Sequence, residues 1–431
     1  MRSSGFKSLL TVSVIAMLVT MACGTGSSDK GTVHVLAVWA GSEEDSFKAV
    51  LAPFTQKTGI KVSYESTRDV DALLQTRIAA GNPPEIAGLP SPSTLSKLAS
   101  QGHLVQLDNG IIDMTKFSAQ YSPGWIQQGT VNGKLYEVFS WAAVKGLIWY
   151  DPKNFTAKGY QVPTNWDEFI SLQNKIKSSG TTPWCVAVES QAASGWPGSD
   201  WVKEIVLSQS GPTVYDNWWQ GKVKWTDPAI KQAWQTWGTI LGSGDSNVYG
   251  GKNYILSTNF GNGGDGLFAN PPKCYMHNQA SFITDNFVKN TPGIAPGTDF
   301  NFFPLPDVNP AYAGAHVGSG DAFSLLKDTP QARQLMQYLV TPEAQAIWVK
   351  RGGKLSPNKN FDLANYPDDI TRQVAKVMTG AKIFDFDAGD IMPTPMRDAY
   401  WSAVLAFITD QSKLDSILSG LDQVQATAYK A

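Results

Sequence analysis

The stretch VHVLAVW, residues 33–39, opens the pattern that decides the fold. Its β-branched and apolar residues are typical of a buried strand. Apolar residues then recur at helical spacing in FKAVLAPFTQKTG, residues 47–59, which ends on a glycine. The alternation continues with a strand at 60–66, a helix at 70–80 and a strand at 85–90. The order strand, helix, strand, helix, strand predicts a mainly parallel sheet covered by helices.

The composition indicates a globular protein of two domains with a cleft between them. A chain of 431 residues is too long for one compact core. Its net charge of −2 argues against nucleic acid or another phosphate-rich partner. The 15 tryptophans exceed what packing alone needs, and we expect roughly a third of them at a binding surface, where aromatic rings are favoured.

The first residues are typical of an export signal. Arg2 and Lys7 give a positive start, and the apolar run at 9–19 is too short to span a bilayer comfortably. Residues 1–22 are therefore predicted to be a signal peptide. No other apolar run in the sequence is long enough to cross a membrane.

The end of this signal resembles a bacterial lipoprotein processing site. In VTMAC, Cys23 would become the lipidated N-terminus, although Thr20 and Met21 depart from the usual pattern. A plain secretory signal is the alternative. Residues 23–31 are polar and are expected to tether the folded body to a lipid anchor.

Two cysteines remain in the predicted mature chain, Cys185 and Cys274. Export to an oxidising compartment favours a disulfide between them, with two buried free thiols as the rival interpretation. No metal or cofactor is expected, because neither cysteine has a second Cys or His at ligand spacing.

Tryptophans beside an acid mark a candidate binding site in ASGWPGSDW, residues 193–201. Glycine and proline interrupt this run, so Trp196 and Trp201 do not resemble members of an ordinary buried helical stripe. A pyranose offers an apolar face and a rim of hydroxyls, which suits indole rings next to a carboxylate such as Asp200. The alternative for either tryptophan is the hydrophobic core.

The chain is expected to cross between two bodies at 133–155 and again at 316–326. In open α/β sheets, ligands gather at the carboxyl ends of the strands. These ends correspond here to the loops 39–44, 67–69 and 90–93. A helix is expected from residue 330 to about 351, and the chain after GGKLSPNK, residues 352–359, is expected to be helical.

The order of several short motifs resembles a known family. These motifs are WAGSEED, TGIKV, NGKLY, YDPKNF, VGSGDAF, TPEAQAIW and GDIMPTPMRDAYWSAV. Together they resemble the extracytoplasmic solute-binding proteins of ABC importers for sugars. TPWCVAVESQAASGWPGSDW and FDFDAGDIMP are most similar to α-glucoside binders, and IMP followed by YWSAV is similar to the maltose-binding type.

The resemblance implies two α/β lobes that close on a sugar as a hinge, in a monomer that delivers its ligand to a membrane permease. The N-terminal lobe would comprise 32–142 and 319–352, and the C-terminal lobe 143–318 and 353–431. A third crossing, near Gly352 and Gly353, comes from the resemblance alone.

The expected ligand-binding residues fall into two groups. The first lobe and the crossings offer polar or aromatic side chains at strand ends, namely Trp39, Ser42, Glu43, Glu44, Arg68, Trp141, Lys145, Ser319 and Asp321. The second lobe offers Trp196, Asp200, Trp201, Gln279, Arg397 and Trp401, of which Gln279, Arg397 and Trp401 rest on the resemblance. Glu43 or Glu44 could instead stabilise a helix start. Indole faces from opposite lobes are expected to hold the sugar.

Two other functions remain open. A binder of a non-sugar solute would suit a peptide or a polyamine, and a polyamine site needs more acids around the rings. A glycoside hydrolase needs two acids flanking the scissile bond, which sequence spacing cannot identify. The sequence contains neither GxSxG nor HExxH, so we expect a binding protein and not an enzyme.

Overall fold

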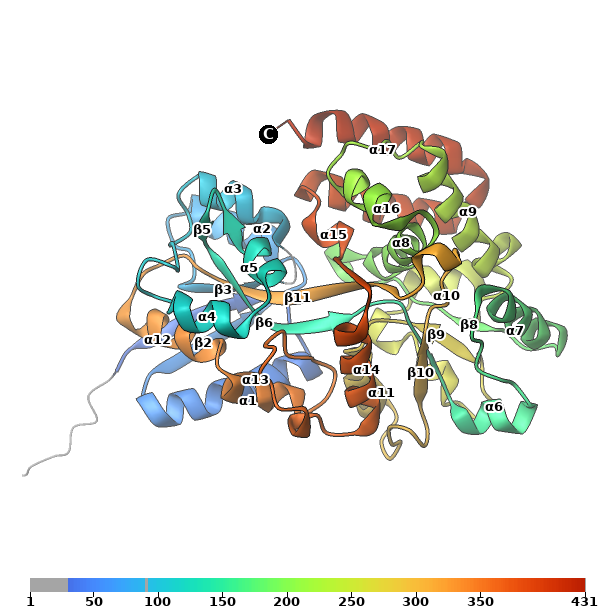
Figure 1. Ribbon diagram of the computed structural model, residues 1–431, viewed down its shortest axis with the longest axis horizontal. Coiled ribbons are helices and arrows are strands. Elements are labelled where there is room, and N and C mark those ends of the chain that lie inside the picture. Colours follow the sequence, from blue (N-terminus) through green and yellow to red (C-terminus); the bar gives the residue numbers. More distant parts are fainter. Residues whose placement is uncertain (1–29, 90–91, 431) are drawn as a thin grey trace, which may run out of the picture.

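The computed structural model describes residues 30–89 and 92–430, which form two lobes side by side (Figure 1). The predicted signal peptide, Cys23 and most of the predicted tether lie outside the described residues, as do Pro90 and Ser91. Within the described ranges, no helix is both long enough and apolar enough to span a bilayer.

The first lobe is built on the predicted alternation of strands and helices. Strands β1 (Thr32–Ala37), β2 (Lys61–Ser66) and β3 (Ile86–Leu89) are parallel, with β1 between the other two. Helices α1 (Ser42–Thr58) and α2 (Val70–Ala79) connect them. The predicted strand, helix, strand, helix, strand order is therefore confirmed.

Three further strands complete this sheet and make it mixed. Strand β11 (Ala315–Leu325) runs antiparallel to β3 and to β6 (Glu137–Val144), and parallel to β12 (Ile383–Phe386). Figure 1 shows β6 and β11 passing together from one lobe to the other. The sheet is parallel only in part, because these crossing strands enter it in both directions.

The second lobe has its own sheet, in the order β10-β7-β9-β8. Strands β7 (Leu147–Tyr150), β9 (Met276–Asn278) and β10 (Asn301–Pro304) are antiparallel neighbours, and β8 (Trp184–Cys185) is parallel to β9. Helices cover it, among them the long α8 (Trp196–Trp219) and α16 (Thr394–Thr409).

The remaining elements surround these sheets. The first lobe adds α3 (Leu95–Ser100), α4 (Met114–Gln120), α5 (Pro123–Gln128), β4 (Thr130–Val131), β5 (Lys134–Leu135), α12 (Pro330–Leu339) and α13 (Pro342–Val349). The second adds α6 (Pro152–Lys158), α7 (Trp166–Ser178), α9 (Pro228–Leu241), α10 (Gly251–Ser257), α11 (Ile283–Asn290), α14 (Asp369–Gly380), α15 (Ala388–Ile391) and α17 (Leu414–Ala428).

Two expected helical regions differ from the structure. The single helix expected over 330–351 is broken, because Thr341 caps a new helix through the backbone N–H of Ala344, and Pro342 occupies its first turn. The tail after residue 353 contains β12, whose register is set by pairing with the distant β11. Local periodicity could not reveal that pairing.

The three predicted crossing points lie next to one another. Ser319 of β11 pairs with Ala143 of β6, and Ala142 exchanges backbone hydrogen bonds of 2.8 and 2.9 Å with Leu355. Gly352 and Gly353, just before Leu355, have positive φ values of 106° and 76°, a backbone conformation that favours glycine. A rotation about this one region would change the angle between the lobes.

Candidate functional site

The candidate site is a cavity of about 110 Å³ between the two lobes. From the first lobe, Trp39 and Glu43 follow β1 and Arg68 follows β2, as expected for ligands at strand ends. The crossing segments contribute four polar side chains to its wall, Lys145, Ser319, Asp321 and Lys354.

Lys354 organises the wall on the side of the first lobe. Its ammonium lies 2.7 Å from Asp321 Oδ2 and 3.4 Å from Glu43 Oε1, and Arg68 lies 2.9 Å from Glu43 Oε2. Burial opposes ionisation of Glu43, but Lys354 and Arg68 outweigh it and lower the pKa of this carboxyl. Glu43 is thus held as a carboxylate by two cations.

Two lysines and two aspartates form a buried ring on the opposite side. Lys145 lies 2.9 Å from Asp200 and 3.2 Å from Asp387, while Lys203 lies 2.8 Å from Asp200 and 2.5 Å from Asp387. Burial disfavours the charge on each lysine, yet the aspartates raise both lysine pKa values. The pKa of Asp387 falls to about 2, because the two lysines outweigh the burial of its carboxyl.

Asp390 behaves differently from its neighbours. Burial, together with the charge of Asp387, raises the pKa of Asp390 to about 8, so its carboxyl is mainly protonated at neutral pH. It faces the same cavity and supplies a neutral polar group.

The fifth cation of the cavity wall, Arg397, is also ion-paired. Arg397 on α16 lies 2.7 Å from Asp71 on α2, which adds an ion pair between the lobes. Each of the five cations that line the cavity is therefore paired with at least one carboxylate, either in the wall or just outside it. The cations are Arg68, Lys145, Lys203, Lys354 and Arg397, and their partners are Glu43, Asp200 and Asp321 of the wall and Asp71, Asp387 and Asp398 outside it. A wall whose cations are all ion-paired suits an uncharged ligand.

Two indoles of the second lobe line the cavity, each with a cation over one face. Lys145 Nζ lies 4.9 Å from the ring centroid of Trp196, and Arg397 Cζ lies 4.6 Å from that of Trp401. Phe260 packs edge-on against Trp196, with ring centroids 5.1 Å apart.

Gly195 allows these two indoles to come together. It has a φ of 104° and precedes α8, and a Cβ built on it would lie only 2.4 Å from the carbonyl oxygen of Trp401. A larger residue would force α8 and α16 apart. The motif at 193–201 thus contains the start of α8, which packs closely against α16.

Two polar atoms at the cavity are buried with neither a hydrogen-bond nor an ion-pair partner among the described residues. They are Ser190 Oγ and Trp401 Nε1, whereas Asp200 Oδ1 has the ammonium of Lys203 at 2.8 Å. Buried polar groups are normally hydrogen-bonded, so both atoms are available to the hydroxyls of a ligand.

The structure brings most of the predicted site residues to this cavity. These are Trp39, Glu43, Arg68, Lys145, Trp196, Asp200, Ser319, Asp321, Arg397 and Trp401. Five others lie outside its wall. Trp141 and Trp201 belong to the two hydrophobic cores. The side-chain oxygen of Gln279 accepts from the N–H of Ala280, Glu44 pairs with Lys48, and Ser42 lines two neighbouring pockets.

The expected pair of facing indoles from opposite lobes is not present. Trp39 donates its indole N–H to Asp321, and its ring packs against Phe47, Trp141 and other rings of the first lobe. It is only 1% exposed, so it contributes an edge to the wall and offers no open face. The accessible aromatic surface of the cavity comes mainly from the second lobe.

Five functional residues of the wall were not predicted from the sequence, namely Ser190, Lys203, Phe260, Lys354 and Asp390. Lys203 lies one helical turn after Asp200, and helical spacing could have indicated it. Asp390 lies in the FDFDAGDIMP motif, and Lys354 follows the paired glycines of the third crossing. Phe260 gave no local signal, because its place at the cavity depends on the packing of a glycine-rich loop.

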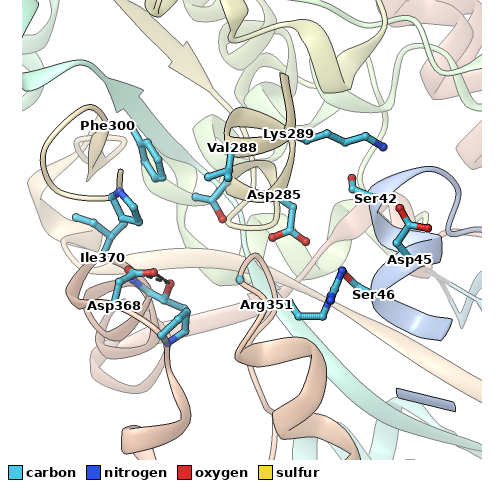
Figure 2. Close-up of a pocket in the computed structure, with 15 residues that line it drawn as sticks. Ser42, Asp45, Ser46, Asp285, Val288, Lys289, Phe300, Arg351, Asp368 and Ile370 are labelled. Carbon is cyan, nitrogen blue, oxygen red and sulfur yellow. Dashed lines mark hydrogen bonds between the residues drawn. The ribbon is translucent and has the colours of Figure 1, made fainter. Parts of the chain in front are cut away.

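A larger pocket of about 530 Å³ lies elsewhere along the seam between the lobes. Figure 2 shows its side chains, with Ser42 and Asp45 from α1, Asp285 and Lys289 from α11, and Ile370 from α14. It is open to solvent and has no tryptophan in its wall. The smaller cavity combines indoles with hydrogen-bonding groups from both lobes, so we take that cavity as the candidate site despite its smaller volume.

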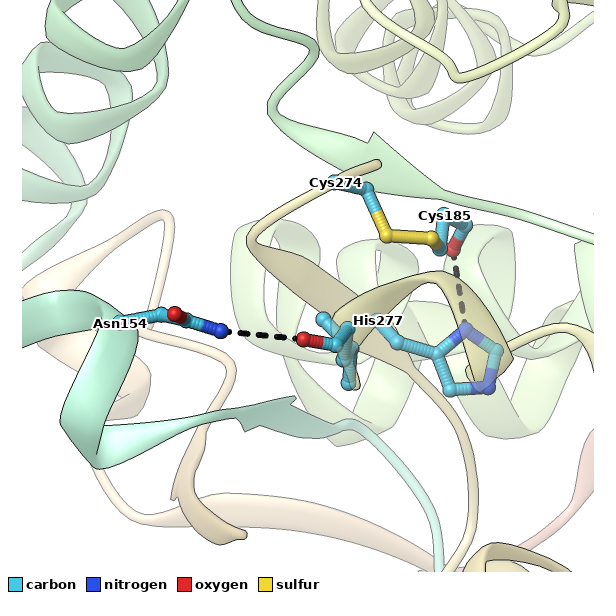
Figure 3. Close-up of a disulfide and its surroundings, with 5 residues drawn as sticks. Asn154, Cys185, Cys274 and His277 are labelled. Carbon is cyan, nitrogen blue, oxygen red and sulfur yellow. Dashed lines mark hydrogen bonds between the residues drawn. A yellow bond between two sulfur atoms is a disulfide. The ribbon is translucent and has the colours of Figure 1, made fainter. Parts of the chain in front are cut away.

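The sulfur atoms of Cys185 and Cys274 are at bonding distance (Figure 3), with Cα atoms 5.5 Å apart. The adjacent His277 ring nitrogen Nδ1 lies 2.9 Å from the carbonyl oxygen of Cys185. Burial lowers the pKa of His277 to about 4, so this ring is neutral. The pair links β8 to the segment that enters β9 and lies away from the cavity wall.

Two lobes closed on a cavity beside adjacent crossings define the class of two-lobed solute-binding proteins. The chain belongs to the bacterial extracellular solute-binding protein family, which it matches over residues 40–346.

Two curated relatives extend over most of the chain. It is 35% identical to the osmoprotective compounds-binding protein GgtB of Synechocystis sp., covering 93% of this chain and 94% of that protein. It is 32% identical to the alpha-glucosides-binding periplasmic protein AglE of Rhizobium meliloti, covering 89% and 85%.

Solved structures share the fold at low sequence identity. A chitin oligosaccharide binding protein superposes with a TM-score of 0.80 at 17% identity, covering 93% of this chain and 99% of that chain. Maltose-bound MalE3 of T. maritima gives 0.72 at 19% identity, covering 92% and 99%. The predicted two-lobed α/β fold is thereby confirmed.

Proposed function

We propose that this protein is the substrate-binding component of an ABC sugar importer and captures an uncharged glucoside between its lobes. The observation that carries the proposal is the cavity between the lobes, whose wall has ion-paired cations, two indoles and two buried polar atoms without a partner among the described residues. The names of the α-glucosides-binding and osmoprotective compounds-binding relatives support the same ligand class.

Binding proceeds by closure of the lobes. Residues on the crossing segments, Lys145 and Lys354, touch the cavity from the region about which the lobes would rotate. Contacts made only in the closed form shift the population toward that form. A membrane permease then recognises the closed shape of the monomer.

The ligand is released unaltered. Retaining and inverting glycosidases both need a free carboxylate opposite a protonated acid. Here the carboxylates of Glu43, Asp200 and Asp321 are each tied to lysine or arginine, which disfavours a role as nucleophile or base. The same ion pairs disfavour a polyamine ligand, since that cation would need surplus acids.

Isothermal calorimetry with maltose, trehalose and sucrose, combined with chromatography of the recovered sugar, tests the proposal. We expect heat of binding from at least one disaccharide and no product. Hydrolysis of the sugar would contradict the assignment as a binding protein, and the absence of binding to any saccharide would contradict the ligand class.

We further propose that the protein is exported, is anchored through lipidated Cys23 and has a disulfide between Cys185 and Cys274. Family membership and the sulfur geometry support export and the disulfide. Replacing Cys23→Ser should release the protein from the membrane fraction. Retention of that variant in the membrane would contradict the anchor.

A further inference from the structure

One short segment of the first lobe reaches the cavity wall through Arg68 and contacts the second lobe at two places. This segment, residues 68–71, leads from β2 into the first turn of α2 and is named the cap. Arg68 lies 4.9 Å from the ring centroid of Phe260, and Asp71 lies 2.7 Å from Arg397. Phe260 and Arg397 belong to parts of the second lobe that are far apart in sequence, so the cap bridges them.

The cavity beside the cap is small. The cavity of about 110 Å³ is well below the roughly 300–1,000 Å³ of pockets that enclose drug-sized ligands. Arg68, Phe260 and Arg397 all belong to its wall. A ligand that extended past them would have to break contacts between the lobes, and closure would then be incomplete.

We infer that the cap selects ligands by length, so that this protein takes compact, uncharged glycosides of no more than two sugar units. The Asp71–Arg397 ion pair holds the cap in place. The inference rests on the proposed function and adds to it an upper limit on ligand size and the element that sets this limit.

Asp71 is the residue best suited to test the cap. It is absent from the cavity wall, so its replacement removes no ligand contact from that wall. Its side chain remains 21% exposed, and serine or asparagine in the first turn of α2 is compatible with a helix start. Asp71→Asn and Asp71→Ser should therefore both fold.

Asp398 offers a matched control. It lies 2.9 Å from the same guanidinium of Arg397, but it is on α16 in the same lobe. Asp398→Asn removes one carboxylate from Arg397 without touching the link to the cap. The comparison separates the effect of that link from a general change in the charge around Arg397.

The experiment is calorimetric titration of wild type and variants with methyl α-glucoside, maltose, trehalose, maltotriose and maltotetraose. Wild type should bind a monosaccharide glycoside or a disaccharide at least about tenfold more tightly than either longer sugar, a difference within the range that single contacts produce. In Asp71→Asn and Asp71→Ser, this preference should shrink by about three- to tenfold, whereas Asp398→Asn should keep it within about twofold.

The possible outcomes separate the length limit and the role of the cap from sugar binding itself. Equal affinity of wild type for maltose and maltotriose would overturn the length limit while leaving sugar binding intact. The role of the cap would be overturned if both folded Asp71 variants kept the wild-type preference for short over longer sugars. It would also be overturned if Asp398→Asn lost as much of this preference as the Asp71 variants. Failure of folded wild type to bind any saccharide would overturn the proposed function and this inference with it.

Discussion

Replacing Gly195→Ala tests the contact that places the two indoles of the site. Gly195 precedes α8 with a φ of 104°, and its missing side chain leaves room for the backbone of α16. Alanine introduces two separate penalties here, one from backbone conformation and one from crowding. Gly180→Ala is the matched control, because Gly180 has a φ of 80° in the same lobe but has no atom within 4 Å of its built Cβ.

The magnitudes follow from these two environments. Holding an alanine at positive φ costs about 1–2 kcal/mol in both variants. At Gly195, the new Cβ also lies 2.4 Å from the carbonyl oxygen of Trp401, and such overpacking adds about 1–3 kcal/mol. The effect of alanine on the unfolded chain is similar at both positions, so it cancels in the comparison.

Urea unfolding measures both variants against wild type. We expect Gly195→Ala to be less stable than Gly180→Ala by about 1–3 kcal/mol. Sugar affinity should also fall in Gly195→Ala, because Trp196 and Trp401 separate, and should be retained in Gly180→Ala. Equal stability of the two variants would refute the close packing of α8 on α16, and undiminished affinity would refute its role in positioning the indoles.

Three further predictions address the site, the pH response and the cysteines. Trp401→Ala and Trp196→Ala should each weaken sugar binding, measured by calorimetry, by about 1–3 kcal/mol through lost ring contact. Trp219 lies at the far end of α8 and outside the cavity wall, so Trp219→Ala should leave the affinity unchanged. Full affinity in both site variants would contradict the assignment of Trp196 and Trp401 to the site. Burial raises the pKa of Glu137 from its ordinary 4.5 to about 8, so its stabilising contribution is complete below 4.5 and is lost as pH rises through 8. Wild type should therefore lose stability in urea across this window. Glu137→Gln should show a shallower loss, and an identical slope would contradict the raised pKa. Cys185→Ser with Cys274→Ser should reduce stability by about 2–4 kcal/mol, and alkylation of denatured wild type should change its mass at these residues only after reduction. Alkylation without reductant would show free thiols.

The fold of the first lobe could be predicted because its signals are local. Strand composition, helical periodicity and a terminal glycine specify each element from β1 to β3 within its own residues. Residues 316–326 were expected only as a second crossing. The strand β11 in this region pairs antiparallel with β3 and parallel with β12, and both pairings depend on residues far away in the chain. For that reason the mixed sheet and the strand β12 were not foreseen.

The sequence indicated which segments of the chain form the site more reliably than which residues of those segments line the cavity. Trp196 and Trp201 are five positions apart on α8, which places them about 140° apart around the helix at 3.6 residues per turn. Only Trp196 reaches the cavity, and Trp201 packs against Trp184 in the core. The sequence identified the motif, but it did not reveal that a helix begins there. Knowledge of that helix would have separated the two tryptophans and linked Lys203 to Asp200.

The absence of facing indoles has a physical cause. A tryptophan just past the first strand could equally pack among other aromatic rings in the core of the first lobe or line the cavity. Trp39 packs into that cluster with Phe47, Trp141 and Trp348. The ion-paired groups around Lys354 then form the polar wall on its side of the cavity.

A crystal structure with a bound disaccharide tests the central claim most directly. We predict electron density for the sugar between the lobes, with a ring against Trp196 or Trp401 and hydroxyls within hydrogen-bonding distance of Lys145 and Lys354. A disaccharide bound in the open 530 Å³ pocket instead, or an interlobe cavity that excludes every disaccharide tested, would contradict the account.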